Sequence, residues 1–164
     1  LLCSTPELGH DVDSEGSVRY AGMNLPYDHD GCSYRYSPVD FCDARHRARI
    51  EDALQNQKPN FNQHYLLVQT DDRPEYFQRT VVLVDTRTGE ATPLPIDAFT
   101  GAAGKGGDAA SYGTLETSVD QQQFCLDGAL LVYRVFEEGR FCFGFDGERF
   151  TGHETQYMQA TDSR

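Results

Sequence analysis

Residues 76–86 read YFQRTVVLVDT, and this segment indicates the fold more strongly than any other. The run is rich in β-branched and aromatic residues, a composition typical of a strand. An Arg-Thr-Gly turn signal follows at residues 87–89, and residues 90–95, EATPLP, fit a short returning strand. Pro93 and Pro95 confine that return to a sheet edge or a strand end, because proline donates no ladder hydrogen bond. Residues 76–95 therefore predict an antiparallel hairpin.

The chain on both sides of this hairpin continues in short strands. Residues 64–69 are β-prone, and an Asp-Gly dipeptide between β-prone runs is a strong hairpin signal. Further strands are predicted at residues 123–126, 129–136, 140–145 and 149–152, with turns at residues 127–128, 137–139 and 146–147. The sequence thus predicts a mainly β fold. We expect an antiparallel meander over residues 64–152, blade-like or closed into a small sandwich.

One helix is predicted before the sheet, over residues 38–57. Ser37 can cap it, Pro38 suits the first helical position, and Asp40 favours the positive end of the helix dipole. Residues that recur mostly at three- and four-residue steps form a largely apolar stripe that we expect to face the sheet: Val39, Cys42, His46, Ile50, Ala53 and Leu54. Lys58 and Pro59 end the helix.

Length and charge limit the classes of function. The chain has 164 residues, which suits one domain, with residues 1–37 as an irregular segment pinned by cysteines. The net charge is 14 − 26 = −12, which argues against nucleic acid or an anionic membrane surface as partner. No apolar run approaches the ~20 residues of a membrane-spanning helix. A basic protein partner fits this charge.

The cysteines bear on the compartment. No CxxC motif or zinc-ligand spacing occurs among Cys3, Cys32, Cys42, Cys125 and Cys142. We interpret them as two disulfides and one odd thiol, which requires an oxidising compartment; five reduced thiols in a cytosolic protein are the alternative. The first residues, Leu-Leu without Met, fit a secreted protein whose signal peptide has been removed, although a shortened chain would look the same. We expect a periplasmic or secreted protein.

The pairing of the cysteines is left open by the sequence. Cys32 and Cys42 enclose nine residues and can bridge. With turns placed at residues 127–128 and 137–139, Cys125 and Cys142 come out offset by about 10 Å or more, too far for an unstrained bridge. Cys3 is then the expected partner of either one.

The most unusual segment is residues 101–113, GAAGKGGDAASYG, hereafter the glycine-rich loop. Five of its thirteen residues are Gly and four are Ala, so few side chains can anchor it. Loops of about 12 or more residues without their own structure are usually functional or disordered. It is not a phosphate loop: Gly101 and Gly106 have the right spacing, but Gly107 and Asp108 replace the lysine and the hydroxyl.

No catalytic signature occurs elsewhere in the chain. The five histidines are scattered, and none accompanies a nucleophile motif, so we assign no catalytic residue and do not expect an enzyme. Residues 27–31, YDHDG, carry ligand-type side chains, but the further acids of a calcium loop are missing and a polar turn fits better. We expect no metal and no cofactor.

Residues 81–89 and the meander around residues 141–143 resemble periplasmic immunity proteins of type VI secretion effectors, in particular those that block peptidoglycan amidases. The resemblance covers roughly residues 64–152. It implies an inhibitor that plugs the catalytic cleft of a cell-wall hydrolase, the cognate effector. From the loop alone, we expect Ser111 and Tyr112 to contact this basic partner at the loop's tip, flanked by Lys105 and Asp108.

Two other classes of function remain open. A module that binds wall glycans or a protein would expose Tyr20, Tyr27, Tyr34 and Tyr36 on a platform, whereas the same tyrosines could instead pack a sparse N-terminal core. A small periplasmic enzyme without a recognisable motif would show a polar cleft with a perturbed histidine.

Overall fold

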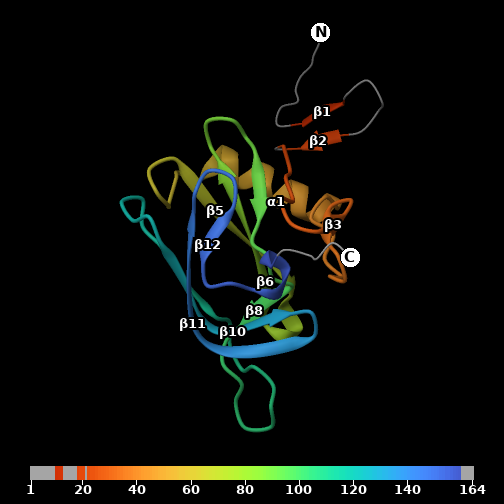
Figure 1. Cartoon of the computed structure of the whole chain (residues 1–164), viewed down its shortest axis with the longest axis vertical. Coiled ribbons are helices and arrows are strands. Elements are labelled where there is room, and N and C mark those ends of the chain that lie inside the picture. Colours follow the sequence, from red (N-terminus) through yellow and green to blue (C-terminus); the bar gives the residue numbers. More distant parts are fainter. Residues whose placement is uncertain (1–9, 13–17, 21, 160–164) are drawn as a thin grey trace.

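The computed structural model describes residues 10–12, 18–20 and 22–159 (Figure 1). Within these residues the fold is mainly β, as predicted, every strand pair is antiparallel, and there is one α-helix. The elements are β1 (His10–Val12), β2 (Val18–Tyr20), β3 (His29–Asp30), β4 (Ser33–Tyr34), α1 (Ala44–Asn56), β5 (Tyr65–Arg73), the 3₁₀ turn η1 (Pro74–Tyr76), β6 (Gln78–Asp85), β7 (Ala91–Pro93), β8 (Ala98–Thr100), β9 (Thr114–Glu116), β10 (Phe124–Val132), β11 (Val135–Phe145), β12 (Phe150–Gly152) and the 3₁₀ turn η2 (Gln156–Met158).

The main sheet has eight strands in the order β12-β11-β10-β8-β6-β5, with β7 beside β6 and β9 beside β10. Two long hairpins, β5–β6 and β10–β11, are joined through the short β8. The sheet bends, so that its two ends face each other. The ring of Phe61, just before β5, lies edge-on to Phe124 in β10, and Tyr65 lies edge-on to Phe145 in β11, with centroids 5.1 and 5.5 Å apart. The result resembles a small sandwich.

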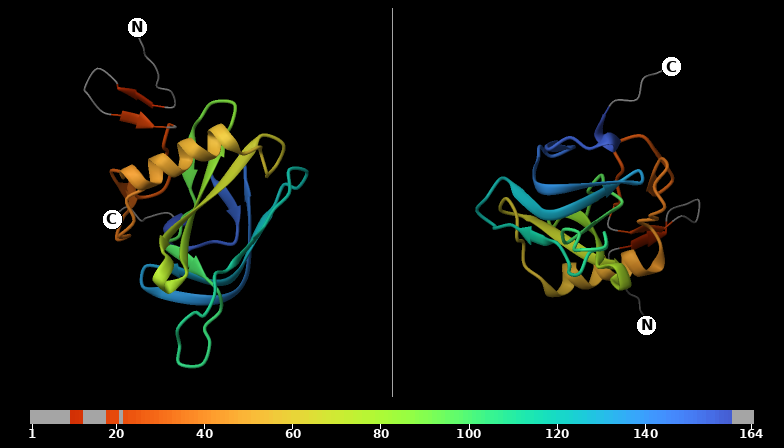
Figure 2. Two further views of the ribbon diagram at one scale, coloured as in Figure 1. Left: turned by 180° about the vertical axis from the view of Figure 1, so that it is seen from behind. Right: turned by 90° about the horizontal axis from the view of Figure 1, so that it is seen from below.

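The strand predicted at residues 76–86 is β6, and it lies in the core. Thr80–Val84 are buried without alternation, because both faces of the sheet are covered at this point. Helix α1 covers one face, where it packs on β5 (Figure 2) and buries Ile50 and Ala53. The returning strand, β7, pairs with β6 as predicted, with Pro93 opposite Val82.

The predicted helix starts six residues too early. Ser37 and Asp40 do not cap α1 but hold a local turn, in which their side chains accept hydrogen bonds from the backbone N–H groups of Val39 and Cys42. Asp43 is the actual cap, since its carboxylate accepts a hydrogen bond from the backbone N–H of His46. The predicted end is correct to one residue, and the stripe is correct from His46 onward.

The turns predicted at residues 127–128 and 137–139 are wrong. Gly128 and Gly139 lie opposite each other inside the β10–β11 hairpin, which reverses instead at Tyr133 and Arg134, both with positive φ. Gly128 is required by close approach: a Cβ there would lie 2.0 Å from the carbonyl oxygen of Thr100. The turn predicted at residues 146–147 is correct.

The register of this hairpin corrects the predicted disulfide pairing. Cys125 and Cys142 are directly opposed, with Cα atoms 4.0 Å apart, and they form a disulfide. The predicted offset was wrong because it rested on the misplaced turns. The second disulfide is Cys32–Cys42, as expected. Cys3 lies outside the described residues. Two disulfides indicate folding in an oxidising compartment.

Some elements were not predicted. Strands β8 and β9 have three residues each, which is too short for a periodic pattern. In the N-terminal segment, where extended chain and short strands are expected, the strands pair as two small hairpins, β1–β2 and β3–β4. No helix in the described part of the chain is both long and apolar enough to cross a bilayer.

Candidate functional site

The glycine-rich loop leaves β8, projects beyond the end of the sheet and returns to β9 (Figure 1). It is a narrow hairpin bonded to itself. From base to tip, the N–H of Gly101 donates to the carbonyl oxygen of Ser111 at 2.8 Å, Ala103 pairs with Ala109, and the N–H of Gly104 donates to the carbonyl oxygen of Asp108 at 3.0 Å. These backbone contacts give the loop a defined shape, although it has few side chains that could anchor it.

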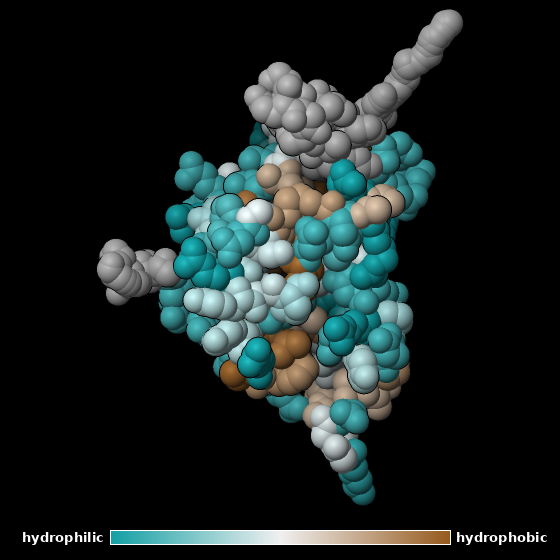
Figure 3. Space-filling model, turned by 90° about the vertical axis from the view of Figure 1, so that its right-hand side faces the viewer, coloured by the Kyte–Doolittle hydropathy of each residue, from teal (hydrophilic) through white to brown (hydrophobic). Residues whose placement is uncertain are grey.

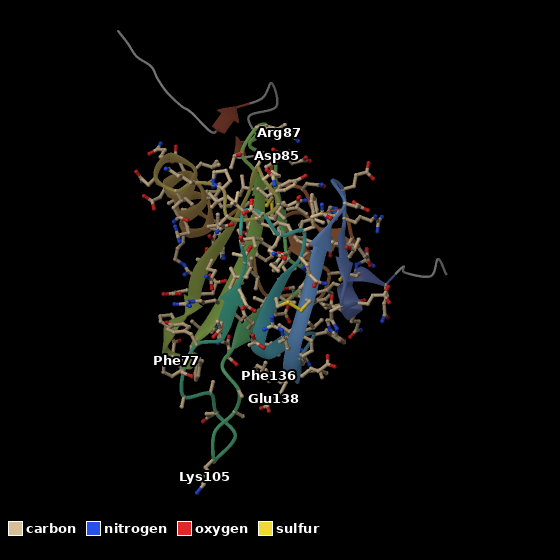
Figure 4. The ribbon with its side chains drawn as sticks, turned by 90° about the vertical axis from the view of Figure 1, so that its left-hand side faces the viewer. Phe77, Asp85, Arg87, Lys105, Phe136 and Glu138 are labelled. Carbon is tan, nitrogen blue, oxygen red and sulfur yellow. A yellow bond between two sulfur atoms is a disulfide. The ribbon has the colours of Figure 1, made fainter. Side chains whose placement is uncertain are left out.

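The tip of the loop consists of residues 105–107. Gly106 and Gly107 both have φ of 92°, in the region that favours glycine, and a Cβ on either would have no heavy atom within 4 Å. Glycine is therefore required at both positions by the backbone conformation and not by a lack of space for a side chain. Lys105 is the tip's only long side chain, and it points away from the body of the protein (Figure 4).

The four predicted contact residues lie at different heights along the loop. Lys105 and Asp108 are exposed near the tip, whereas Ser111 and Tyr112, expected at the tip, are at the base. The ring of Tyr112 lies edge-on to Phe77, with centroids 5.2 Å apart, and the guanidinium carbon of Arg79 is 3.7 Å from its centroid. Tyr112 thus fixes the loop to the sheet, and the expectation that it forms the tip was wrong.

A cavity of about 330 Å³ opens beside the base of the loop. It lies between the loop, η1 and the β10–β11 hairpin, so three segments distant in sequence form its walls. Its lining includes Glu75, Tyr76, Gln78, Thr100, Ala103, Asp108, Phe136 and Glu138. The Glu138 carboxylate accepts a hydrogen bond from the backbone N–H of Ala103 at 2.9 Å and so connects the hairpin to the loop.

Large apolar side chains are exposed at this end of the molecule. Tyr76 and Phe136, the aromatic rim of the cavity, are 53% and 54% exposed. On the hairpin turn, Tyr133 packs on the exposed Tyr36, with centroids 5.4 Å apart. Figure 3 shows one face of the protein, mostly hydrophilic and interrupted by apolar patches at its centre and toward the end from which the loop projects. Such exposed apolar groups are typical of interaction surfaces.

Sequence reasoning missed the aromatic rim and its acids. Phe136 was assigned to a strand end and Glu138 to a turn, so neither was connected with the loop. Figure 4 shows both residues beside the loop's base, far along the molecule from Asp85 and Arg87. The sequence did contain a signal for this site: the apolar pair Val135-Phe136 is followed directly by two glutamates. With the correct hairpin register, this apolar-acidic boundary lies at the end of the sheet.

A second polar cluster lies where α1 meets the end of β5. The His46 ring is buried between two carboxylates, with Nδ1 2.8 Å from Asp43 and Nε2 2.9 Å from Asp72. Arg45 pairs with Asp72 at 2.8 Å. Burial of the ring opposes its charge, but the hydrogen bonds and charges of Asp72 and Asp43 outweigh it and raise the pKa of His46.

This cluster is suited to structure rather than catalysis. Both ring nitrogens of His46 lie within hydrogen-bond distance of carboxylates and the side chain is only 3% exposed, so neither nitrogen is open to a substrate. A cavity of about 320 Å³ adjoins the cluster and includes Asp97, whose pKa is raised by burial. The carboxylate of Asp97 is bonded to the Tyr157 hydroxyl and the Tyr133 N–H, both at 2.9 Å. These contacts connect the start of β8 with the end of β10 and with η2.

The other candidate residues have structural roles. Tyr27 and Tyr34, two members of the glycan platform, are buried, and Tyr34 stacks on Tyr157 with centroids 5.3 Å apart. Tyr36 is exposed, and the side chain of Tyr20 lies outside the described residues. Asp28 and Asp30, in the segment considered for a cation, approach Arg35 at 3.4 and 4.0 Å, as expected of a polar turn.

Metal-ligand geometry occurs once among the described side chains. Cys32, Asp40 and Cys42 bring three ligand atoms within 4.8 Å of one another. The two sulfurs are bonded to each other, so the group offers no thiolate.

Comparison of the chain with protein-family models, curated proteins and solved structures finds no match. Function must therefore be inferred from the geometry of the loop and the surface around its base.

Proposed function

We propose that this protein is an immunity protein: a periplasmic inhibitor that binds a basic effector enzyme, a peptidoglycan hydrolase, and closes its active-site cleft with the glycine-rich loop. The observation that carries the proposal is the shape of this loop, a self-bonded narrow hairpin beyond the end of the sheet. A loop that already has a fixed shape loses little entropy when it enters a cleft.

The chemistry of the loop supports the same function. Residues 102–104 and 106–107 carry no side chain larger than a methyl group, so the hairpin can approach another backbone closely. Lys105 and Asp108 supply polar contacts near the tip, and Ser111 and Tyr112 hold the base. The aromatic rim provides the large apolar contacts from which hot spots are built.

Charge and compartment are consistent with such a partner. A net charge of −12 attracts a basic protein over long range and accelerates its association. The two disulfides favour an oxidising compartment, and the periplasm is where a cell-wall hydrolase acts.

The test is a shortened loop. Replacing residues 104–108 by Asn-Gly leaves the Ala103–Ala109 pair and closes it with a two-residue turn. The matched control is Arg87→Ala, an exposed residue in the β6–β7 turn at the opposite end (Figure 4). Inhibition is measured on peptidoglycan sacculi with the product of the gene beside this protein's own, which the proposal expects to be a secreted hydrolase.

We expect the shortened loop to weaken inhibition by about 30-fold or more, the equivalent of one hot spot of ~2 kcal/mol. The melting temperature should stay within about 2 °C, because the loop bonds mainly to itself. Arg87→Ala should inhibit like the wild type. Full inhibition by the shortened variant, or no inhibition of the enzyme by the wild type, would contradict the proposal.

A further inference from the structure

The cavity beside the loop's base combines an apolar wall with a negative one. Tyr76 on η1 and Phe136 on β11 are each about half exposed. Exposing two large rings to water is unfavourable unless another group covers them. The loop forms the remaining side of the cavity through Ala103 and Asp108.

The charge of the cavity has one sign. Among the described residues of its lining there is no Lys, Arg or His, and the Asp and Glu side chains are three: Glu75, Asp108 and Glu138. Lys105 points away from the cavity at the far end of the loop (Figure 4). Glu138 is held in place by the Ala103 N–H, which occupies one carboxylate oxygen, Oε2, and leaves Oε1 for another donor.

Aromatic faces and carboxylates together select a cation with an apolar stem. The face of a ring attracts an ammonium or guanidinium group within about 6 Å, and the aliphatic stem of arginine or lysine packs well on aromatic surface. A guanidinium can also donate to a carboxylate and stack on a ring at the same time. If a neutral or acidic side chain filled the cavity, the negative charge of the three carboxylates would remain unbalanced.

We propose that this cavity is the anchor site for an arginine or lysine side chain of the basic partner, held between the aromatic rim and Glu138. The inference rests on the proposed function, to which it adds the partner residue that is recognised. The loop would then close the partner's cleft, while the cavity beside it takes a cationic side chain from the cleft's edge.

The test needs no partner protein. Uniformly ¹⁵N-labelled protein is titrated with N-acetyl-arginine-N′-methylamide and, separately, with the citrulline analogue, which has nearly the same shape and no charge. We expect saturable shifts in the amides of residues 75–76, 103, 108 and 136–138, with a dissociation constant of millimolar order, and at least about fivefold weaker binding of the citrulline compound. Equal shifts with both compounds, or shifts spread over the acidic surface, would overturn the proposal.

Two variants separate charge from structure. Glu138→Gln keeps an oxygen that can accept from the Ala103 N–H but removes the charge, and Phe136→Ala removes one wall. Each should weaken arginine-amide binding by about threefold or more, whereas Glu148→Gln, on the exposed β11–β12 turn, should not. Unchanged binding by both cavity variants would place the cation elsewhere. That result would contradict the anchor site but not the inhibitor proposal, which the shortened loop tests separately. A shortened loop that inhibits fully, together with a positive titration, would contradict only the inhibitor proposal.

Discussion

The buried contact between His46 and two carboxylates makes a specific prediction for stability. In the variant His46→Gln the side chain has a similar size but no charge. The Asp72 carboxylate, 12% exposed, would lose its imidazolium partner and keep Arg45, while Asp43, 43% exposed, would be hydrated. Removing one partner of a buried ion pair costs about 3–5 kcal/mol, and the remaining Arg45 and the exposure of Asp43 reduce that figure. We expect the free energy of unfolding to fall by about 2–3 kcal/mol at pH 6.

The same contact makes stability depend on pH. The pKa of His46 is raised in the folded state, so its contribution is complete below the unfolded-state pKa of about 6.5. As the pH rises through the folded-state pKa, the ring loses its proton and the contribution disappears. The free energy of unfolding should therefore decrease above about pH 6.5, by at most about 1.4 kcal/mol per pH unit. The difference between wild type and variant should shrink accordingly.

The assay is urea unfolding at a series of pH values from about 6 to 9, followed by circular dichroism or tyrosine fluorescence, since the chain has no Trp and 9 Tyr. Lys105→Gln, at the exposed loop tip, serves as control and should follow the wild type. A wild-type stability that rises over this range, or a variant with the same pH slope as the wild type, would refute the assignment of a buried imidazolium.

The disulfides, a glycine and the surface charge make three further predictions. Alkylation without reductant should modify at most one of the five cysteines, and Cys125→Ser with Cys142→Ser should lower the free energy of unfolding by about 2–4 kcal/mol in a urea titration; five modified cysteines would exclude both bridges. Gly128→Ala should destabilise by about 2 kcal/mol or more, because the Cβ meets the Thr100 oxygen at 2.0 Å, whereas Gly147→Ala, with open space around it, should cost about 1 kcal/mol. Equal melting temperatures for the two glycine variants would contradict the close approach of β8 to β10 at Gly128. Association with a basic hydrolase should slow as salt rises, and stopped-flow rates independent of salt would remove the electrostatic contribution.

The sequence predicted those parts of the fold in which local pattern and tertiary position agree. The β-branched run of β6 has nearly all its side chains in the core, and the stripe of α1 from His46 to Ala53 faces the sheet. The turn predicted at Asp127-Gly128 was wrong, because glycine is needed there for the close approach of β8 and not for a turn. The position of β8 cannot be read from the sequence. The real reversal, at Tyr133 and Arg134, uses two residues that carry no turn signal.

Only the part of the candidate site that lies in one continuous segment could be predicted from the sequence. Composition identified the glycine-rich loop, since a run of small residues is visible without knowing the fold. The opposite walls of the cavity come from η1 and β11, about 25 residues before and after the loop. Their approach depends on the register of β10 with β8 and β11, and a one-residue error in register moves every side chain to the other face.

The Cys125–Cys142 bond has a topological consequence for proteolysis. It closes a covalent ring around the β10–β11 hairpin, spanning a sequence separation of 17 residues, and the exposed turn at Tyr133 and Arg134 lies inside that ring. A protease that cuts the turn would therefore release no fragment, and the nick would be visible on a gel only after reduction. The cleaved hairpin would keep Phe136 beside the loop through the remaining strand pairs, so a single cut in the turn would leave this end of the molecule in place.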